Sequence, residues 1–238
     1  LSNCNFTANK SDRGGAIANF SKLFITNSTF SSNMAPSDCR AGAIYNAPNS
    51  TANITGSTFS GNSALWGGAI YNFGFLGIIN STFSGNNATQ EGGAIYNSIE
   101  VNILNSTFSG NAAPLGGAGI WNDGGNLLFS NTIIANSTAG SECANYGQIS
   151  LNKNNLVEDM SCGADYSGDP SLGPLADNGG PTLTHALLPG SSAIDLGDSS
   201  LCQLFDQRGV KRPQGAGCDI GAYEYEYSLI FLPILLKQ

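Results

Sequence analysis

Charged residues are scarce in this sequence, and basic residues are the scarcest. Charged side chains make up 11% of the 238 residues, whereas a typical soluble domain contains roughly 25%. No Lys or Arg stands between Arg40 and Lys153. A nucleic-acid-binding protein needs a basic patch or stripe along its contact face, so the sequence argues against this class. The small number of Glu and Lys residues also excludes a helical bundle or a coiled coil.

Several other signatures are missing as well. No Cys-x-x-Cys pair is present, which argues against a zinc site. The apolar run at residues 229–236 is far shorter than the roughly 20 residues that a bilayer requires, so we expect no membrane span. No signal peptide is recognisable, and we therefore expect a mature or truncated chain. Glycine follows no every-third-residue rule, which excludes collagen.

Glycine, asparagine and serine are abundant instead. The chain has 31 Gly, 27 Asn and 28 Ser, which together make up more than a third of it. The hydrophobic content of 41%, with 12 Phe and 8 Tyr, is sufficient for a buried core and argues against disorder. The composition therefore predicts a turn-rich β protein, either one long domain or one domain with an appendage.

The cysteines form an even set without metal-binding spacing, which favours disulfides. They are Cys4, Cys39, Cys143, Cys162, Cys202 and Cys218. Of the possible connectivities we expect sequential pairing (4–39, 143–162 and 202–218), because each pair then lies within one or two structural units. The alternative is a set of buried thiols. Disulfides imply an oxidising compartment, so we expect a secreted protein.

A repeat of about 25 residues dominates residues 1–140. Each unit carries Phe-x-x-Asn, at Phe6/Asn9, Phe30/Asn33, Phe59/Asn62, Phe83/Asn86 and Phe108/Asn111, with Ile133/Asn136 as a variant. A Gly-Gly-Ala-Ile motif or a close variant of it runs in phase, beginning at Gly14, Ala41, Gly67, Gly92 and Gly117. A third, apolar column lies five residues before each Phe or its substitute, at Ile25, Ile54, Ile78, Ile103 and Leu128.

Three short strands per unit, with Gly and Asn between them, predict an all-β fold. We expect a right-handed parallel β-helix of three-strand coils, followed by an irregular C-terminal segment. One coil cannot bury its apolar side alone, whereas coils stacked about 4.8 Å apart place Phe on Phe and Ile on Ile. We expect Asn at the corners because it tolerates left-handed backbone and its side chain hydrogen-bonds the backbone of a turn.

The paired Gly-Gly-Ala-Ile and Phe-x-x-Asn motifs resemble those of the chlamydial polymorphic membrane proteins. The resemblance covers residues 1–140, and it implies a β-helical, surface-exposed adhesin.

After about residue 140 the period fades, and Asp and Pro accumulate. The runs Ser192-Ala193-Ile194-Asp195, Asp206-Gln207-Arg208-Gly209 and Asp219-Ile220-Gly221-Ala222-Tyr223-Glu224 are similar to the C-terminal region of choice-of-anchor Q domain proteins. That resemblance implies a secreted bacterial β-helix. We therefore divide the chain into regular repeats (1–140), a choice-of-anchor-Q-like segment (141–228) and an apolar tail (229–238). The tail is either a sorting signal or a strand that caps the apolar end of the helix.

Residues next to the inward-facing Ile of each unit point outward if the strands alternate. This column begins with Ala18 and continues with four aromatic residues, Tyr45, Tyr71, Tyr96 and Trp121. Sugar rings and other flat apolar groups stack well on such side chains, so the column is a candidate glycan- or partner-binding face. Alternatively, a loop or the acidic C-terminal segment covers it.

A second outward array flanks the Phe column. It consists of Thr29, Thr58, Thr82, Thr107 and Thr132, with Ser31, Ser60, Ser84 and Ser109. A regular Thr-x-Ser array on a flat sheet resembles ice-binding β-solenoids, which makes ice binding a remote alternative. Thr and Ser also simply suit exposed strand positions.

The sequence does not predict a catalytic site or a cofactor. Enzymes that cleave acidic polysaccharides need grouped carboxylates, but residues 41–140 contain only Glu91, Glu100 and Asp123. Glu91 lies just before a Gly-Gly turn, and Glu100 and Asp123 lie on different coils at unlike phases. The single histidine, His185, has no triad-like arrangement and is assigned a structural role. A Ca²⁺ site is conceivable at the late aspartates, although Asp in such turns is usually a turn former. These aspartates are Asp165, Asp169, Asp177, Asp195, Asp198 and Asp206.

Taken together, these features predict a non-enzymatic, adhesin-like protein that is secreted or displayed on a cell surface and contacts glycans or proteins. A polysaccharide-binding or polysaccharide-degrading β-helix enzyme is the alternative. The first repeat shows no evident cap, so we also expect head-to-tail self-association into filaments, with the apolar tail of one copy on the open end of the next.

Overall fold

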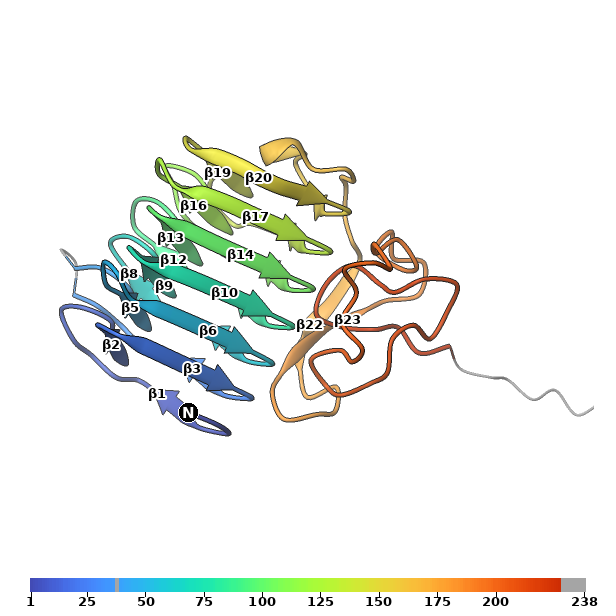
Figure 1. Cartoon of the computed structure of the whole chain (residues 1–238), viewed down its shortest axis with the longest axis horizontal. Coiled ribbons are helices and arrows are strands. Elements are labelled where there is room, and N and C mark those ends of the chain that lie inside the picture. Colours follow the sequence, from blue (N-terminus) through green and yellow to red (C-terminus); the bar gives the residue numbers. More distant parts are fainter. Residues whose placement is uncertain (37–38, 228–238) are drawn as a thin grey trace, which may run out of the picture.

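The computed structural model describes residues 1–36 and 39–227, and it confirms an all-β parallel β-helix (Figure 1). Three parallel sheets of seven, six and six strands run along one axis. Each complete coil contributes one strand to each sheet, and the incomplete first coil adds β1 to the seven-stranded sheet. Successive coils pair in phase, so Phe30 lies opposite Phe59 and Tyr71 lies opposite Tyr96. The period of the sequence is therefore the period of the coils.

The seven-stranded sheet carries the Phe column, and we call it the phenylalanine sheet. Its strands are β1 (Asn5–Thr7), β4 (Thr29–Ser31), β7 (Thr58–Ser60), β11 (Thr82–Ser84), β15 (Thr107–Ser109), β18 (Ile133–Ala135) and β21 (Leu156–Val157). A six-stranded sheet, the long-strand sheet, contains β3 (Lys22–Thr26), β6 (Thr51–Thr55), β10 (Phe75–Ile79), β14 (Glu100–Leu104), β17 (Asn126–Ser130) and β20 (Gln148–Lys153).

The other six-stranded sheet carries the aromatic column, and we call it the tyrosine sheet. Its strands are β2 (Ile17–Asn19), β5 (Ile44–Asn46), β9 (Ile70–Asn72), β13 (Ile95–Asn97), β16 (Ile120–Asn122) and β19 (Cys143–Asn145). A short parallel pair, β8 (Ser63–Ala64) and β12 (Asn87–Ala88), lies between the phenylalanine and tyrosine strands of two coils. A 3₁₀ turn, η1 (Ser161–Gly163), and an antiparallel hairpin, β22 (Leu172–Ala176) with β23 (Thr184–Leu187), follow the coils.

The predicted Phe ladder is confirmed. Rings from Phe6 to Phe108 stack nearly parallel, with neighbouring centroids 4.6–4.8 Å apart. Phe30, Phe59, Phe83 and Phe108 are fully buried, as are the Ile residues that precede the tyrosine column. Stacked rings at this spacing add a specific attraction to the burial of apolar area. The interior is thus a set of ladders that repeat from coil to coil.

The predicted Asn ladder is also confirmed. Its members are Asn9, Asn33, Asn62, Asn86 and Asn111, and each Nδ2 donates to Oδ1 of the next Asn at 2.9–3.0 Å. From the second member onward, Oδ1 also accepts a backbone N–H of the preceding Asn. Asn62 and Asn86 are fully buried, and their Nδ2 groups also donate to the carbonyls of Phe30 and Phe59. The buried amides therefore satisfy one another and the backbone.

The predicted left-handed backbone at the ladder Asn residues was wrong. Asn9, Asn33, Asn62, Asn86 and Asn111 do not have positive φ. The residue before each of them does, with φ of 55–68° at Ala8, Ser32, Gly61, Gly85 and Gly110. The turn is thus made one position earlier, often by Gly, which adopts this conformation without steric strain. Asn62 and Asn86 are selected for their side-chain hydrogen bonds, whereas Asn27, Asn80 and Asn105 do make left-handed turns elsewhere in the coils.

Two further polar ladders occupy the remaining corners, and the sequence reasoning missed both. Asn residues that follow the outward aromatic position bond side chain to side chain through six coils: Asn19, Asn46, Asn72, Asn97, Asn122 and Asn145. The hydroxyls of Ser28, Ser57, Ser81 and Ser106 each accept a backbone N–H from the preceding coil. Both sets recur at the repeat period, so a column-by-column reading would have found them.

The register of the sixth coil differs from the prediction by one residue. Phe129, and not Leu128, pairs with Ile103, and Ile134, and not Ile133, continues the Phe column. Ile133 takes the outward position that Thr holds in earlier coils. Asn136 is exposed and does not extend the Asn ladder. The cause is one extra residue in this coil before β17, which moves every later side chain to the next position.

The two glycines of the repeated motif have different roles. The first has a positive φ of 60–69° at Gly14, Gly67, Gly92 and Gly117. At the second, a Cβ on Gly15, Gly42 or Gly68 would lie 2.1 Å from a carbonyl oxygen of the adjacent coil. The first position therefore needs left-handed backbone, and the second needs the absence of a side chain.

The C-terminal segment, residues 167–227, packs along the outer face of the phenylalanine sheet, at the right of Figure 1. Gln207 donates to Thr58 and accepts from Thr82, and Thr107 accepts the N–H of Ala222. These three threonines are at most 1% exposed. The Thr array is thus covered at these three central positions, which contradicts the continuous, flat exposed surface that the ice-binding alternative needs.

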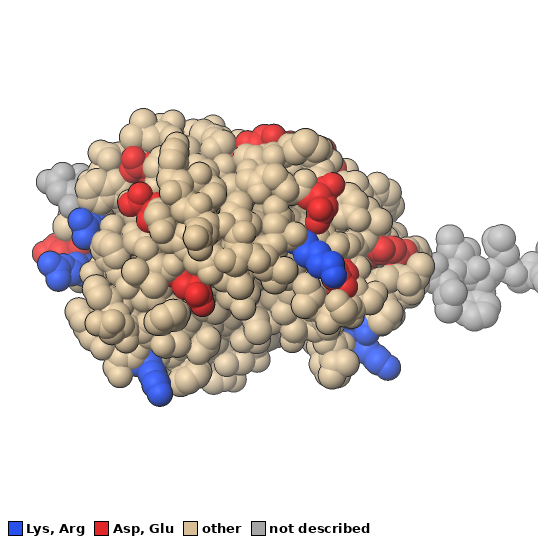
Figure 2. All heavy atoms as spheres, turned by 45° about the horizontal axis from the view of Figure 1, so that its top comes forward, with Lys and Arg blue, Asp and Glu red and all other residues tan. Residues whose placement is uncertain are grey.

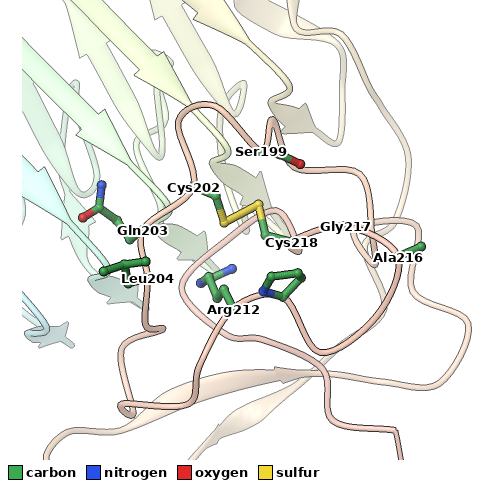
Figure 3. A pocket seen from close by; sticks show the side chains of 9 residues that line it. Ser199, Cys202, Gln203, Leu204, Arg212, Ala216, Gly217 and Cys218 are labelled. Atoms are coloured by element: carbon green, nitrogen blue, oxygen red, sulfur yellow. A yellow bond between two sulfur atoms is a disulfide. The ribbon is translucent and has the colours of Figure 1, made fainter.

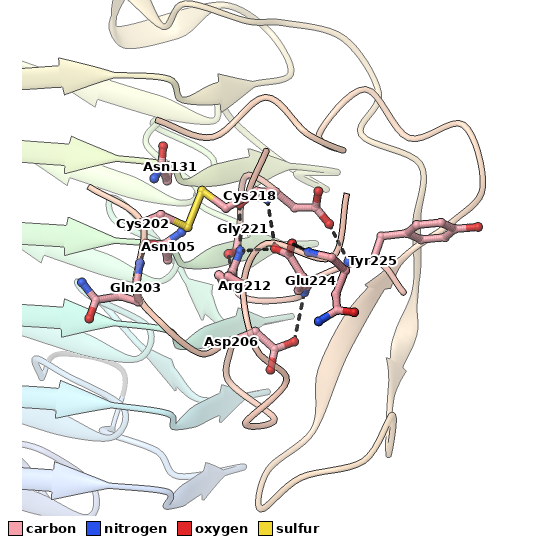
Figure 4. Close-up of polar contacts among 12 residues, drawn as sticks. Asn105, Asn131, Cys202, Gln203, Asp206, Arg212, Cys218, Gly221, Glu224 and Tyr225 are labelled. Carbon is pink, nitrogen blue, oxygen red and sulfur yellow. Dashed lines mark hydrogen bonds and ion pairs between the residues drawn. A yellow bond between two sulfur atoms is a disulfide. The ribbon is translucent and has the colours of Figure 1, made fainter. Parts of the chain in front are cut away.

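A buried ion-pair network holds this segment in its folded form (Figure 4). Arg212 donates to Oε2 of Glu224 at 3.0 Å and to the carbonyls of Asp219 and Gly221. The carboxylate of Asp206 accepts from Arg208 and from the backbone N–H of Glu224. The sequence motifs that contain Asp206 and Glu224 therefore meet in space and fix each other.

The predicted boundary at residue 140 falls within the last coil, because β19, β20 and β21 continue the three sheets to Val157. The apolar tail predicted at 229–238 lies outside the described residues. No helix within residues 1–36 and 39–227 has the length and apolar character needed to cross a bilayer.

Two of the three predicted disulfides are confirmed, Cys143–Cys162 and Cys202–Cys218. The Cys4–Cys39 pairing was wrong, since both residues are free thiols among the described residues. Cys4 precedes β1 at the corner next to the long-strand sheet. Cys39 precedes the tyrosine sheet, where its carbonyl accepts the N–H of Leu65. The two residues occupy different corners of the coil, because they are close to one and a half repeats apart in sequence and not a whole number of repeats.

Candidate binding groove

The aromatic column lies in register on the outer side of the tyrosine sheet. Tyr45, Tyr71, Tyr96 and Trp121 occupy the same position on β5, β9, β13 and β16. The rings of Tyr71 and Tyr96 stack with centroids 4.6 Å apart, and those of Tyr45 and Tyr71 are 6.1 Å apart. Regular register therefore turns a sequence column into a continuous aromatic strip.

The strip is covered at one end and open at the other. Tyr45 and Tyr71 are only 7% and 4% exposed, because Phe20 packs beside Tyr45 and Phe73 packs edge-on against Tyr71. Tyr96 and Trp121 are partly exposed. Of the two alternatives for this column, a binding face and a face covered by a loop, the covering loop therefore describes Tyr45 and Tyr71. The acidic C-terminal segment lies on a different sheet.

A second column, which the sequence reasoning missed, runs alongside the aromatic strip. It consists of the residue before each Gly-Gly motif: Arg13, Arg40, Trp66, Glu91 and Gly116. Parallel bridges join Arg13 to Arg40, Arg40 to Trp66, and Glu91 to Gly116. We call this the pre-glycine column. Its fixed place in the repeat was the signal that could have revealed it.

A groove lies between the two columns. Its volume is about 310 Å³, and it is lined by Arg40, Trp66, Tyr71, Gln90, Glu91, Tyr96, Trp121 and Asp123. A neighbouring hollow of about 420 Å³ shares Arg40 and Trp66 with it and adds Asp12, Arg13 and Cys39. Because they share these residues, the two hollows form one depression that crosses several coils.

Aromatic and charged groups alternate in the groove walls. The Arg40 guanidinium carbon lies 5.1 Å from the ring centroid of Tyr71 and 5.5 Å from that of Trp66, within cation–π range. The Tyr96 hydroxyl donates to Asp123 at 2.5 Å. Burial, and then this hydrogen bond, raise the pKa of Tyr96, so its hydroxyl remains a donor at neutral pH. Burial also raises the pKa of Tyr71.

One buried polar atom of the groove has no partner within the described residues. Oε2 of Glu91 is buried and makes no hydrogen bond within the described residues. An unpaired buried acceptor is destabilising, and a bound donor group would remove that penalty.

Two of the three carboxylates within residues 41–140 meet in the groove. Glu91, which was expected just before a Gly-Gly turn, and Asp123 both line it. Glu91 reaches it from the pre-glycine column, and Asp123 from the turn after β16 (Figure 1 shows the strand). Glu100 starts β14 in the long-strand sheet and does not line the groove. Residues from different columns can thus meet when their coils are adjacent.

Charged groups are few on the face of the molecule that Figure 2 shows, and wide uncharged areas separate the blue and red groups. Within the part of the chain that the structure describes, no three His, Cys, Asp or Glu side chains form a metal-binding group. Asp206 bonds to Arg208 and to backbone N–H groups, and Asp195 accepts from Gly217 and Tyr227. His185 bonds to Ser84 and to the Gly173 carbonyl.

A second hollow lies in the C-terminal segment, beside the Cys202–Cys218 disulfide (Figure 3). Its volume is about 200 Å³, and Leu204 and Pro213 supply apolar walls. Arg212 is the charged residue among those that line it. Three carboxylates interact with that guanidinium, so the hollow has no excess positive charge. It is a less promising binding site than the groove.

The fold and the groove define a parallel β-helix repeat protein with an aromatic depression along one sheet. Residues 56–72 and 80–98 match the family model of the Chlamydia polymorphic membrane protein repeat. The matched residues contain the Phe and Tyr strands of two adjacent coils, together with Trp66, Tyr71, Glu91 and Tyr96. Neither the curated proteins nor the solved structures compared with the chain gave a significant match.

Proposed function

We propose that this protein is a non-catalytic, adhesin-like β-helix that works outside the cell or on its surface and binds saccharides in the groove. One observation carries the proposal: stacked aromatic side chains in an open depression, with hydrogen-bonding groups on both walls. Sugar rings present apolar faces to aromatic rings and hydroxyls to polar side chains.

Two further observations support the location and the adhesin role. The repeat similar to that of the polymorphic membrane proteins favours a surface protein. The two disulfides favour an oxidising compartment. Secretion and the resemblance to choice-of-anchor Q domain proteins stay predictions. Head-to-tail assembly also stays a prediction, which electron microscopy of native material tests.

A glycan array followed by calorimetry tests the proposal. Trp121→Ala and Tyr96→Ala should each weaken binding of the best glycan about tenfold, because each removes a stacking surface. Phe75→Ala is the matched control, since Phe75 is an aromatic side chain 50% exposed on β10 of the long-strand sheet. The proposal fails if both groove variants bind like the unmodified protein, or if the array shows no ligand.

One specific observation favours the polysaccharide-degrading alternative: Glu91 and Asp123 both line the groove. Glycoside hydrolysis uses such a pair as acid and base or as acid and nucleophile. Release of reducing ends from the bound glycan decides between the two functions. The binding function predicts no release above that of a Glu91→Gln, Asp123→Asn double variant, whereas release that this variant lacks would establish an enzyme.

A further inference from the structure

The groove has a basic end and an acidic end. Along the pre-glycine column the charge changes from two arginines, through Trp66, to Glu91. Arg13 and Glu91 lie three coils apart, a distance of about 14 Å at the usual strand spacing. A ligand that fills the groove therefore meets groups of opposite charge at its two ends.

The basic end is suited to an anion. Arg13 and Arg40 are exposed and stand opposite each other on adjacent coils. Like charges at directly opposite positions repel, and a bound carboxylate would relieve this repulsion. The face of the Arg40 guanidinium packs on Trp66 and Tyr71. This packing limits its rotamers and keeps the planar donor fork, which matches a carboxylate, in a defined orientation. Asp12 also lines this end, which leaves one net positive charge.

The acidic end is suited to hydroxyl donors. The unpaired Oε2 of Glu91 needs a donor, and Asp123 already accepts one hydrogen bond from Tyr96. Backbone groups of the tyrosine strands are paired within their sheet, so the groove offers side chains and not a free strand edge. A ligand with many hydroxyls and flat apolar faces satisfies these groups, whereas a peptide strand has no edge to join.

We propose that the groove recognises an acidic saccharide. A carboxylate on one sugar residue binds Arg13 and Arg40, and an uncharged part of the same chain stacks on Tyr96 and Trp121 with a hydroxyl on Glu91. This inference rests on the proposed function, and it adds the ligand's charge and its placement along the solenoid axis.

Calorimetry with two probes tests it: a tetrasaccharide with one terminal hexuronic acid, and the same tetrasaccharide after reduction of the carboxyl group to an alcohol. We expect the acidic probe to bind about tenfold more tightly, the effect of one charge-assisted hydrogen bond, and the difference to shrink at high salt. Equal affinities would overturn the inference and leave saccharide binding intact. Absence of binding by both probes, together with an empty glycan array, would overturn the proposed function as well.

Amino-acid substitutions test where the carboxylate of the acidic probe binds. Arg13→Gln and Arg40→Gln should each bring the ratio of the two affinities close to one. Lys22→Gln is the matched control: it removes the same charge at an exposed position on β3, in another sheet, and should leave the ratio at its original value. A ratio that persists in both arginine variants contradicts the assignment. Replacement of Arg40 also removes its packing on Trp66 and Tyr71 and could disturb the groove wall. Arg13 is exposed, so the Arg13 variant tests the inference without this complication.

Discussion

Two outer faces of the solenoid carry regular columns, and they differ in what lies over them. On the phenylalanine sheet, Thr58, Thr82 and Thr107 are buried beneath residues of the C-terminal segment. On the tyrosine sheet, local side chains are the cover that the described residues provide, and among these residues Tyr96 and Trp121 remain partly exposed. One repeat thus provides a docking face for its own chain and a second face that the described residues leave partly open.

The two faces also use polar groups differently. The C-terminal segment keeps Arg212 and Glu224 almost completely buried, where each charge needs its partner to offset the loss of hydration. The groove keeps Asp123 and Arg40 exposed, where water competes for them. Loss of one polar partner should therefore destabilise the protein strongly on the covered face and weakly on the open face.

The largest expected effect follows from Arg212→Ala. It leaves the Glu224 carboxylate buried without its ion-pair partner, and the carbonyls of Asp219 and Gly221 without a donor. Removing one partner of a buried pair costs about 3–5 kcal/mol. Urea denaturation should show this loss, and proteolysis should cleave first between residues 167 and 227.

Lys211→Ala is the matched control, because Lys211 is adjacent in sequence but exposed. The free energy of unfolding of the Lys211→Ala variant should differ from that of the unmodified protein by less than about 0.5 kcal/mol, as is usual for a surface substitution. Equal effects of the two variants would contradict the view that the buried network holds the covering segment.

The next effect concerns pH. Burial raises the pKa of Asp219 to about 6 from its ordinary value of 3.8, and it also raises the pKa of Glu224. A carboxyl with a higher pKa in the folded state binds a proton more readily when folded. The stability that Asp219 contributes is therefore present in acid and falls as the pH rises from about 4 to about 6, by at most about 3 kcal/mol. Denaturation midpoints across this range measure the slope.

Asp219→Asn should flatten this slope, whereas Asp177→Asn, at an exposed position, should keep it. A slope that is the same in all three proteins would show that Asp219 does not titrate with folding.

The sequence predicted the solenoid far better than its two faces. Phe30 and Asn33 recur at a fixed period, and stacking in register follows directly from such repetition. Coverage of Thr82 could not be predicted, because Gln207 lies 125 residues away and follows no period. The groove was predicted in part: Tyr96 and Trp121 stood in a visible column.

The partners of these aromatic residues were missed for a physical reason. Arg40 and Glu91 share a position in the repeat but not a chemistry, so no column of like residues marked them. The one-residue insertion that brings Phe129 into the core lies in the sixth coil, where the period of the preceding coils predicted Leu128 instead. Short-range patterns identify ladders, whereas sites form where unlike columns lie side by side.

The smallest expected effects come from a matched pair of hydroxyl deletions, one on each face. Thr82→Val removes the donor to Oε1 of Gln207, which is 3% exposed, and leaves that acceptor unsatisfied. This change should cost about 1–3 kcal/mol.

Tyr96→Phe removes a hydrogen bond of similar kind, from the Tyr96 hydroxyl to Asp123. Asp123 is exposed, so water replaces the lost donor, and the cost should stay below about 1 kcal/mol. Chemical denaturation of both variants under one condition compares the two faces directly. A larger loss of unfolding free energy for Tyr96→Phe than for Thr82→Val would mean that the bond from Tyr96 to Asp123 mainly stabilises the fold. Such a result would remove the physical basis for treating the tyrosine sheet as the open, ligand-binding side of the solenoid.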